Sequence, residues 1–442
     1  MVDCRFKLKL RKSPSSYSAL HSKATIDSLD DDCLIHIFEF LSIADRVKIE
    51  RVCKRWQTIS MESWRQCRIL SPDKVSWGLK KGNGNLVMDA KAIYNVLTRC
   101  GFYLKYLEFF GYLDELVTLG NKIGSMCPNL ETIYLCGVSS LSIQNLSEYC
   151  TNIKELGLRD IFETFDNELS FLFEKNKNLT KMTFYSICGI SNGKFFLNLP
   201  FESLKTLSIF NCDFSSFYVN QGIRKLKNLS ELSFDYCENF DDDSMEAICN
   251  LTNLKEIHMG IFPGKIRSCK YMTRLNNLIS IELSSSDLVN NELILALCKN
   301  CRLLSDVNIS ESRVTDEGVH CLTSLPYLQR LNINHLKIHD EAVHPMPNLK
   351  QFECFMCQEL SDKCFSMLLD TSKNLELLNV GCCNVTNSTV KKAVDVTKLR
   401  MNNVILYMYI WGTKIKFDEI TETSPLLRLL RLKRDIKAKN YL

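Results

Sequence analysis

The sequence predicts an α/β protein in which three short helices precede a solenoid, with a curved parallel sheet on the inside and helices on the outside. Two observations carry this prediction. The ten residues at 228–237, NLSELSFDYC, return at 374–383 as NLELLNVGCC, and the same spacing of apolar residues recurs through most of the chain. The segment 26–64 lies outside this repeat and has the apolar periodicity of helices.

Each repeat has apolar residues at offsets 0, 3 and 5, as Leu229, Leu232 and Phe234 illustrate. This is the frame of a leucine-rich repeat, whose period is about 20–29 residues. Thirteen such frames follow one another at intervals of 21 to 26 residues, and the last is a degraded copy. They begin at Leu104, Leu130, Ile153, Leu179, Leu204, Leu229, Leu254, Leu278, Leu304, Leu328, Leu349, Leu375 and Met401.

Within a repeat, polar residues alternate with offsets 3 and 5, as expected for a short strand with one buried face. Turns such as FDDDSM at 240–245 and VTDEGV at 314–319 follow, and their Asp and Thr residues are natural helix N-caps. Thirteen stacked strands about 4.8 Å apart would form a concave face about 60 Å long.

Many of the 21 cysteines fall at fixed repeat positions. At offset 8 these are Cys212, Cys237, Cys357 and Cys383, and three residues before offset 0 they are Cys127, Cys150 and Cys301. A small, weakly polar side chain suits a buried turn between stacked coils. The C-x-x-C pairs at 298–301 and 354–357 overlap repeat positions, so we predict no metal site and no cofactor.

The net charge of +4 comes from the two ends of the chain. Residues 1–24 and 426–442 each contain six Lys or Arg and one Asp, which leaves the rest mildly acidic. This balance argues against nucleic acid as the main ligand. We find no run of 18 apolar residues that would predict a membrane span, and no secretory signal segment. We therefore expect a reducing intracellular location, cytoplasmic or nuclear.

The segment before the repeats predicts three short helices. Ser28 or Asp30 is a candidate N-cap for the first, a second begins near Asp45, and a third contains Val52, Cys53 and Trp56. Four apolar residues of the first follow the spacing of one helix face: Leu34, Ile37, Phe38 and Leu41. Three helices in about 40 residues bury little surface, so we expect them to depend on a partner chain, on the repeats or on both.

The order Leu29, IFEFL at 37–41, Asp45, VCKRW at 52–56 and Trp64 resembles an F-box. Together with the repeats, of which RCGFYLKYLEF at 99–109 resembles the family's first, the chain resembles the F-box and leucine-rich-repeat family. The resemblance implies a substrate receptor of a Skp–cullin–F-box ubiquitin ligase. Such a receptor binds the Skp adaptor, and through it the cullin, with apolar helix faces of its F-box.

Carried over to this chain, the resemblance implies eight adaptor-facing or motif-core residues: Leu29, Leu34, Ile37, Phe38, Leu41, Val52, Cys53 and Trp56. Two positions depart from the family pattern. Asp30 stands where Pro is usual, and Arg46 where Leu is usual, with Val47 as a partial substitute. These departures bear on the strength of adaptor binding. The alternative is that the apolar residues form only a helical core facing the repeats.

We find none of the metalloprotease, serine hydrolase or nucleotide-binding motifs, and predict a non-catalytic protein. The histidines at 335, 339 and 344 are not expected to share a helix face, so they predict no metal site. The expected function is a receptor that promotes ubiquitin-dependent proteolysis of a protein target. The alternative is a repeat scaffold or inhibitor that binds a protein partner without ubiquitylation.

Offsets 2, 4 and 6 of each strand point onto the concave face, where exposed aromatic residues beside charges are candidate hot spots. Five such residues form the predicted target-binding patch: Tyr134, Tyr185, Phe210, Glu231 and Asp235. Acidic residues there favour a target segment with Lys or Arg beside an apolar anchor. Two alternatives are that these aromatics only pack on one another, or that the site lies near Phe355 and Tyr407.

These observations predict five regions along the chain. They are a disordered basic N-terminus (1–24), the F-box (25–70), a connector and N-terminal cap of the repeats (71–99), the repeats (100–411), and a C-terminal cap or tail helix (412–442). Nuclear or mitochondrial targeting is the alternative for the N-terminus. In the C-terminal region Pro425 fits a first helical turn, and a partner-binding or membrane-surface helix is the alternative to a cap.

Overall fold

The computed structural model describes residues 25–72, 76–77, 89–110, 114–161, 163–187, 191–237, 239–260 and 270–431. The chain divides into two compact units. The helical unit comprises residues 1–67 and 74–82, and the solenoid comprises residues 68–73 and 83–442. The predictions for residues 1–24, for the GNGN sequence at 82–85 and for the tail beyond residue 431 lie outside the described residues.

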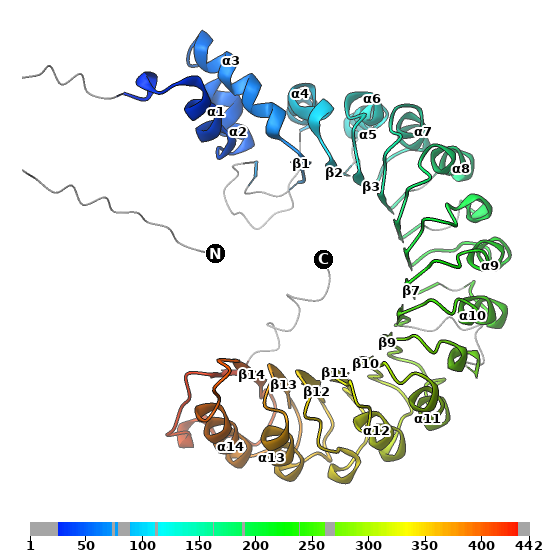
Figure 1. Ribbon diagram of the computed structural model, residues 1–442, viewed down its shortest axis with the longest axis vertical. Coiled ribbons are helices and arrows are strands. Elements are labelled where there is room, and N and C mark those ends of the chain that lie inside the picture. The colour runs from blue at the N-terminus through cyan, green and yellow to red at the C-terminus, as the bar shows by residue number, and fades with distance from the viewer. Residues whose placement is uncertain are drawn as a thin grey trace, which may run out of the picture. The chain divides into compact units, whose positions relative to one another are not determined.

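The helical unit contains the three predicted α-helices, flanked by two 3-10 turns (Figure 1). The elements are η1 (Ile26–Ser28), α1 (Asp31–Glu39), α2 (Ile43–Ile49), α3 (Lys54–Ser63) and η2 (Trp64–Gln66). Asp30 is the N-cap of α1, as predicted, and Ser42 caps α2. Val52 lies before the third helix rather than inside it, because Cys53 forms the N-cap of α3.

The solenoid contains one fifteen-stranded parallel sheet whose strand order follows the chain, as the predicted fold class requires. Its strands line the inner side of an arc (Figure 1). The strands are β1 (Ile69–Leu70), β2 (Tyr106–Phe110), β3 (Thr132–Cys136), β4 (Glu155–Arg159), β5 (Lys181–Tyr185), β6 (Thr206–Phe210), β7 (Glu231–Asp235), β8 (Glu256–His258), β9 (Ser280–Glu282), β10 (Asp306–Asn308), β11 (Arg330–Asn332), β12 (Gln351–Glu353), β13 (Leu377–Asn379), β14 (Leu406–Tyr409) and β15 (Leu427–Leu430).

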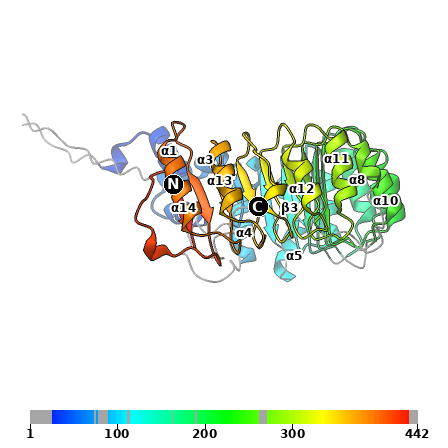
Figure 2. The same ribbon diagram turned by 90° about the horizontal axis from the view of Figure 1, so that it is seen from below.

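Helices cover the outer side of the solenoid and follow one another around it (Figure 2). The α-helices are α4 (Ala90–Cys100), α5 (Asp114–Gly120), α6 (Ile123–Met126), α7 (Ser140–Tyr149), α8 (Asp166–Lys175), α9 (Ser216–Ile223), α10 (Asp242–Cys249), α11 (Asn291–Asn300), α12 (Asp316–Thr323), α13 (Asp362–Thr371) and α14 (Asn387–Lys398). The 3-10 turns are η3 (Gly101–Tyr103), η4 (Lys194–Asn198), η5 (Lys270–Arg274), η6 (Asp340–Ala342) and η7 (Phe417–Glu419). Asp241 closes a capping box on α10, so the predicted acidic turn does begin a helix.

The predicted frames match the strand register through the first twelve repeats. In β6 and β7, for example, Leu207 pairs with Leu232 at offset 3, and both are buried. The thirteenth frame is wrong by four residues. Leu378 pairs with Met408, so this frame begins at Ile405, while Met401 is 96% exposed. Apolar residues crowd this segment, and more than one placement fits the spacing.

The sheet extends one strand beyond the predicted repeats at each end. β1 lies inside the range predicted for the F-box, but its two residues pair with β2 and belong to the solenoid. The predicted tail helix is wrong over Leu427–Leu430, because β15 pairs with β14 there. The sequence LLRLLR fits helix and strand spacing alike, and an open sheet edge favours the strand because it offers unpaired backbone groups.

A left-handed residue turns the chain after the strand in each repeat whose offset-7 residue is described. Their φ angles lie between 49° and 72° at Gly137, Asp160, Ser186, Asn211, Tyr236, Ser285, Glu311, His335, Met356, Cys382 and Gly412. Only a frame beginning at Ile405 places Gly412 at offset 7. The shared conformation is thus an independent check on the corrected register.

The cysteine at offset 8 follows this turn and is buried, as predicted. Three of these thiols donate to the offset-5 carbonyl of the preceding repeat: Cys237 to Ile209 (3.5 Å), Cys357 to Ile333 (3.1 Å) and Cys383 to Cys354 (3.0 Å). Cysteine recurs here because it is small enough for the stacked turn and still offers a weak donor. No disulfide joins any two of the described cysteines.

Among the described residues, no helix combines the length and the apolar content that crossing a bilayer requires.

Candidate partner-binding surfaces

The helical unit has a small core of its own. Leu34, Phe38 and Ile59 are buried together, and the Phe38 ring lies 5.2 Å from that of Trp56. Leu29 and Leu41 pack against this cluster and are partly buried. Five of the eight residues implied by the resemblance therefore contribute to the fold of the unit. Leu34 and Phe38 are enclosed in it, so neither has an exposed side chain to offer.

Other apolar side chains of the unit remain exposed. Ile37 is 39% exposed, Phe40 79% and Val52 60%, and the thiols of Cys33 and Cys53 are exposed too. Positions 33 and 37 of α1 and its C-cap, Phe40, fall on one side of the helix, about a third of a turn from Leu34 and Phe38. Phe40 was missed from the sequence, although the spacing i, i+3 from Ile37 could have found it. Exposed apolar residues grouped on one helix face are candidates for partner contact.

Asp30, the first departure from the family pattern, performs a helix-capping role. Its carboxylate accepts a hydrogen bond from the backbone N–H of Cys33 at 2.8 Å. This bond lowers the pKa of Asp30, since it favours the charged form. Arg55 fixes the same end of the helix by donating to the Asp31 carboxylate and to the Leu29 carbonyl. The start of α1 is therefore held by side chains where the family usually has Pro.

Arg46, the second departure, is almost fully buried at the other end of α1. Its guanidinium donates to the carbonyls of Phe38 (3.1 Å) and Glu39 (2.7 Å), which are among the last of the helix. A cation near a helix C-terminus is favourable because of the helix dipole. The same group lies 4.8 Å from the Trp64 ring centroid, and Trp64 donates to Glu50 at 2.9 Å. Arg46 thus stabilises the unit from inside.

Three of the five predicted target-binding residues lie in one row across the concave face. Tyr185 on β5 pairs with Phe210 on β6, which pairs with Asp235 on β7. The two rings are 6.1 Å apart, and the Arg159 guanidinium lies 4.6 Å from the Tyr185 ring centroid. The aromatics do pack on each other, yet Tyr185 remains exposed. We call these four residues the aromatic row.

The other two predicted residues lie apart from this row. Tyr134 is two strands from Tyr185, where its ring pairs with Tyr106 at 6.0 Å. It covers Gly157, whose missing side chain makes room, since a Cβ there would lie 2.1 Å from the ring. Partial burial raises the pKa of Tyr134 to about 12. Glu231 accepts from Thr206 and is separated from Asp235 along β7 by roughly 13 Å.

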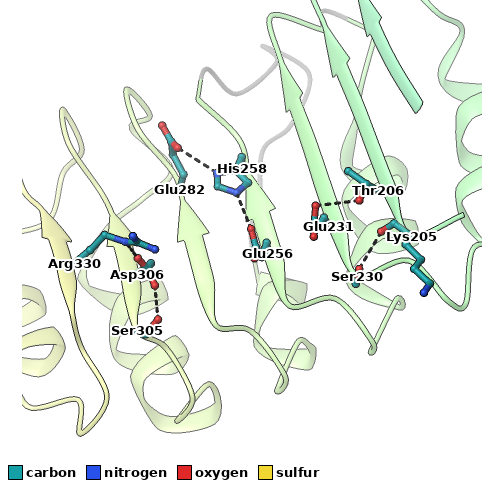
Figure 3. Close-up of polar contacts among 10 residues, drawn as sticks. All are labelled: Lys205, Thr206, Ser230, Glu231, Glu256, His258, Glu282, Ser305, Asp306 and Arg330. Atoms are coloured by element: carbon teal, nitrogen blue, oxygen red, sulfur yellow. Dashed lines mark hydrogen bonds and ion pairs between the residues drawn. The ribbon is translucent and has the colours of Figure 1, made fainter. Parts of the chain in front are cut away.

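Glutamate and aspartate side chains lie on neighbouring strands in the middle of the concave face (Figure 3). His258 on β8 lies between two of them, with Nδ1 3.2 Å from Glu282 and Nε2 3.7 Å from Glu256. The Glu282 contact raises the pKa of His258. Arg330 forms an ion pair with Asp306 on the neighbouring strand. We call Glu231, Glu256, Glu282 and Asp306 the acidic strip.

A second aromatic group lies at late repeats, as the alternative site required. The rings of Phe355 and Trp411 stack at 6.0 Å across Gly381, and Tyr407 is exposed nearby on β14. A Cβ at Gly381 would meet Phe355 at 2.8 Å, so the glycine permits the close approach.

The three histidines of the 335–344 segment have separate partners. His339 contacts Asp316 at 2.8 Å, His344 contacts His320 at 2.7 Å, and His335 packs on Phe355. In the part of the chain that is described, no three His, Cys, Asp or Glu side chains are grouped as metal ligands would be. Burial raises the pKa of Cys301 to about 11 and of Cys357 to about 12, so both C-x-x-C pairs include a thiol held in its neutral form.

A family model described as F-box domain matches residues 26–65. F-box/LRR-repeat protein 12 of Mus musculus is 29% identical over 143 residues, which are 30% of this chain and 40% of the relative. The putative RNA-binding protein EEED8.10 of Caenorhabditis elegans is 22% identical over 69% of this chain and 42% of its own length. The chain thus spans about two fifths of the curated relatives that it matches.

Two solved structures are also similar to this chain. An internalin from Listeria monocytogenes has 17% identity and a TM-score of 0.47, over 70% of this chain and 81% of that one. The yeast Rad7 and Elc1 complex has 19% identity and a TM-score of 0.41, over 72% and 93%.

The helical unit is an F-box domain, so the chain is an F-box protein. The F-box precedes a parallel-sheet solenoid of leucine-rich repeats, and part of the chain is similar in sequence to F-box/LRR-repeat protein 12.

Proposed function

We propose that this protein is the non-catalytic substrate receptor of a Skp–cullin–F-box ubiquitin ligase. The observation that carries the proposal is an F-box domain with Ile37, Phe40 and Val52 exposed beside a small core. Apolar side chains of this size are stabilised when a partner removes them from water, at about 25 cal/mol per Å². The Skp adaptor is that partner, and it links the receptor to the cullin.

The concave face is the proposed target site. The aromatic row offers apolar area at Tyr185 and Phe210, next to Asp235 and roughly 13 Å along β7 from Glu231 of the acidic strip. A target segment that places an apolar side chain on the row and Lys or Arg over the strip would complement both. This acidic character favours a protein over nucleic acid as the ligand. The late aromatic group is the alternative position for the same target.

In this arrangement the receptor needs no chemistry of its own. Holding the target near an activated ubiquitin raises its effective concentration, and the transfer leads to proteolysis of the target. The proposed location is the cytoplasm or the nucleus, where the ligase and reduced thiols occur together. A repeat scaffold or inhibitor that does not recruit a ligase remains the competing function.

Affinity purification of the full chain from cells separates these functions. The wild-type protein is expected to retain the adaptor and the cullin, and a Phe40→Asp/Val52→Asp variant to lose both. Phe217→Asp, which changes an exposed aromatic residue on α9 of the solenoid, is the control and should retain them. A wild-type chain that captures neither the adaptor nor the cullin would favour the scaffold. A double variant that still captures both would show that Phe40 and Val52 are not the adaptor contact.

A Tyr185→Ala/Phe210→Ala/Asp235→Lys variant tests the target site in the same experiment. It should retain the adaptor and lose the proteins that the wild-type repeats capture. If those proteins still bind and are turned over normally, the late aromatic group becomes the site, and Phe355→Ala/Tyr407→Ala should abolish their capture.

A further inference from the structure

A cavity of about 390 Å³ lies on the helical side of the solenoid, between the C-terminal ends of α13 and α14. Its lining includes Arg400, Lys373 and Lys392, together with the exposed apolar residues Leu399 and Met401. None of these residues belongs to the concave face or to the helical unit. The cavity is therefore independent of the function proposed above.

Arg400 is the unusual residue of this cavity. It is only 9% exposed, and its Nη1 donates to the carbonyls of Leu375 and Val404 at 2.9 Å each. Its Nε and Nη2 atoms are buried without a hydrogen-bond partner. A buried donor on a charged group costs more when unpaired than a neutral one, so such an atom requires an explanation. Burial without a carboxylate partner also lowers the pKa of Arg400.

The two unpaired nitrogens lie on one edge of the guanidinium. Nε and Nη2 together form the planar fork that binds two oxygens of a carboxylate or phosphate. The two bonds from Nη1 hold the plane of the group in place, so the fork is already oriented. A ligand that fits it must present two adjacent, negatively charged oxygens.

The charges around the fork favour such a ligand. Lys392 is neutralised by Asp370 at 2.6 Å, while Lys373 forms no ion pair with any described residue. Asp395 also lines the cavity, so Arg400 and Lys373 leave it one positive charge in excess. Because the fork is shielded from solvent, an entering anion must displace lining side chains. Leu399 is 80% exposed and Met401 is more so, and both therefore have little packing to lose.

We propose that this cavity is an oxyanion-binding site, in which the Arg400 fork holds a carboxylate or phosphate group and Lys373 provides a second cation. The exposed apolar residues at its rim would contact the rest of the molecule that carries the group. Water molecules that fill the same space are the competing explanation for the unpaired nitrogens.

Titration calorimetry of the full chain with inorganic phosphate, and separately with acetate, tests the site at constant ionic strength. Saturable binding with one equivalent is expected. Binding of phosphate alone identifies a phosphate ester as the ligand class, and binding of acetate a carboxylate. No saturable binding of either anion would overturn the proposal in favour of water.

Arg400→Lys keeps the charge and removes the fork, so it should weaken binding by about tenfold. Lys363→Ala is the control, since that lysine is exposed and is paired with Glu341 outside the cavity. Equal affinity of Arg400→Lys and wild type would contradict the site. If Arg400→Lys does not melt cooperatively, Lys373→Glu tests the oxyanion site instead. An affinity of Lys373→Glu for the anion equal to that of the wild type would also overturn the assignment.

Discussion

The helical unit and the solenoid bury their apolar residues in different ways. The F-box encloses a core of three residues, Leu34, Phe38 and Ile59, and leaves Phe40 and Val52 exposed. Each inner repeat of the solenoid adds apolar residues at offsets 0, 3 and 5 and stacks on a neighbour at both sides. A solenoid distributes its stability over many interfaces between repeats. A domain of about 40 residues buries little surface and is only marginally stable. The difference supports our proposal that a partner chain completes the F-box.

The two units also treat buried polar groups differently. In the F-box, single buried side chains form individual contacts: Arg46 donates to the Phe38 carbonyl, and Glu50 accepts from the Trp64 indole. In the solenoid, one solution recurs, as the thiols of Cys237 and Cys357 show by donating to equivalent carbonyls. A substitution in the F-box should therefore affect the whole unit, and one in the solenoid a single interface.

Removing one core ring from each unit should give the largest effects. Phe38→Ala and Phe234→Ala each delete a fully buried ring, at a cost of about 3–5 kcal/mol of unfolding free energy. In the F-box this exceeds what the small core supplies, so Phe38→Ala should unfold the unit and abolish adaptor binding. Phe234→Ala should lower the melting temperature and leave adaptor binding intact. Circular dichroism melting and adaptor capture measure both, and equal adaptor binding by the two variants would refute the distinction.

The substitutions at Arg46 should have the next largest effect. Arg46→Ala removes two charge-assisted bonds to the end of α1 and the contact with Trp64, and should cost about 2–3 kcal/mol. Arg46→Leu restores the residue usual in the family and packs apolar surface on Trp64, so it should cost less than Arg46→Ala. Urea denaturation followed by Trp fluorescence compares them. The reverse order would show that the charge itself stabilises the unit.

A smaller effect is expected for a single repeat thiol. Cys237→Ala leaves two carbonyls without their thiol donor and should cost about 1 kcal/mol. Cys33→Ala, at an exposed thiol, should cost nothing measurable. Burial raises the pKa of Cys237 to about 11, so it should react with a thiol reagent only after unfolding, while Cys53 reacts at once. Fast labelling of Cys237 in the native protein would contradict this assignment.

The smallest effect is a pH dependence at the acidic strip. The Glu282 contact raises the pKa of His258 above its usual 6.5 in the folded state. The stabilisation from this contact is therefore fully present below pH 6.5 and is lost as the pH rises through the raised value. The wild type should therefore melt at a higher temperature than His258→Gln at acidic pH. This difference in melting temperature should disappear under alkaline conditions. A difference independent of pH would exclude the contact.

The sequence predicted the fold because the repeat signal is redundant. Twelve frames agreed on one register, and only the frame at Met401 was misplaced, where Ile405, Leu406 and Met408 offer competing positions. The strand β15 was missed because its helical and extended spacings are equally good, and pairing with β14 decides between them.

The candidate sites were less predictable. Even offsets within the repeat place Tyr185, Phe210 and Asp235 on the concave face, and the strand register brings them together. The offsets alone do not show that the Tyr134 ring packs on Tyr106 rather than on this row. The capping role of Arg46 depends on a contact between helices, which no local pattern in the sequence encodes.

Hydrogen–deuterium exchange of the full chain, with and without purified Skp adaptor, tests the central claim most directly. The account predicts that adaptor binding slows exchange throughout α1 and α3, and leaves the strands of the solenoid unchanged. A Phe40→Asp variant should show no such protection, although its exchange without adaptor equals that of the wild type. If the adaptor leaves exchange in α1 and α3 of the wild type unaltered, the F-box is not completed by this partner and the receptor function fails.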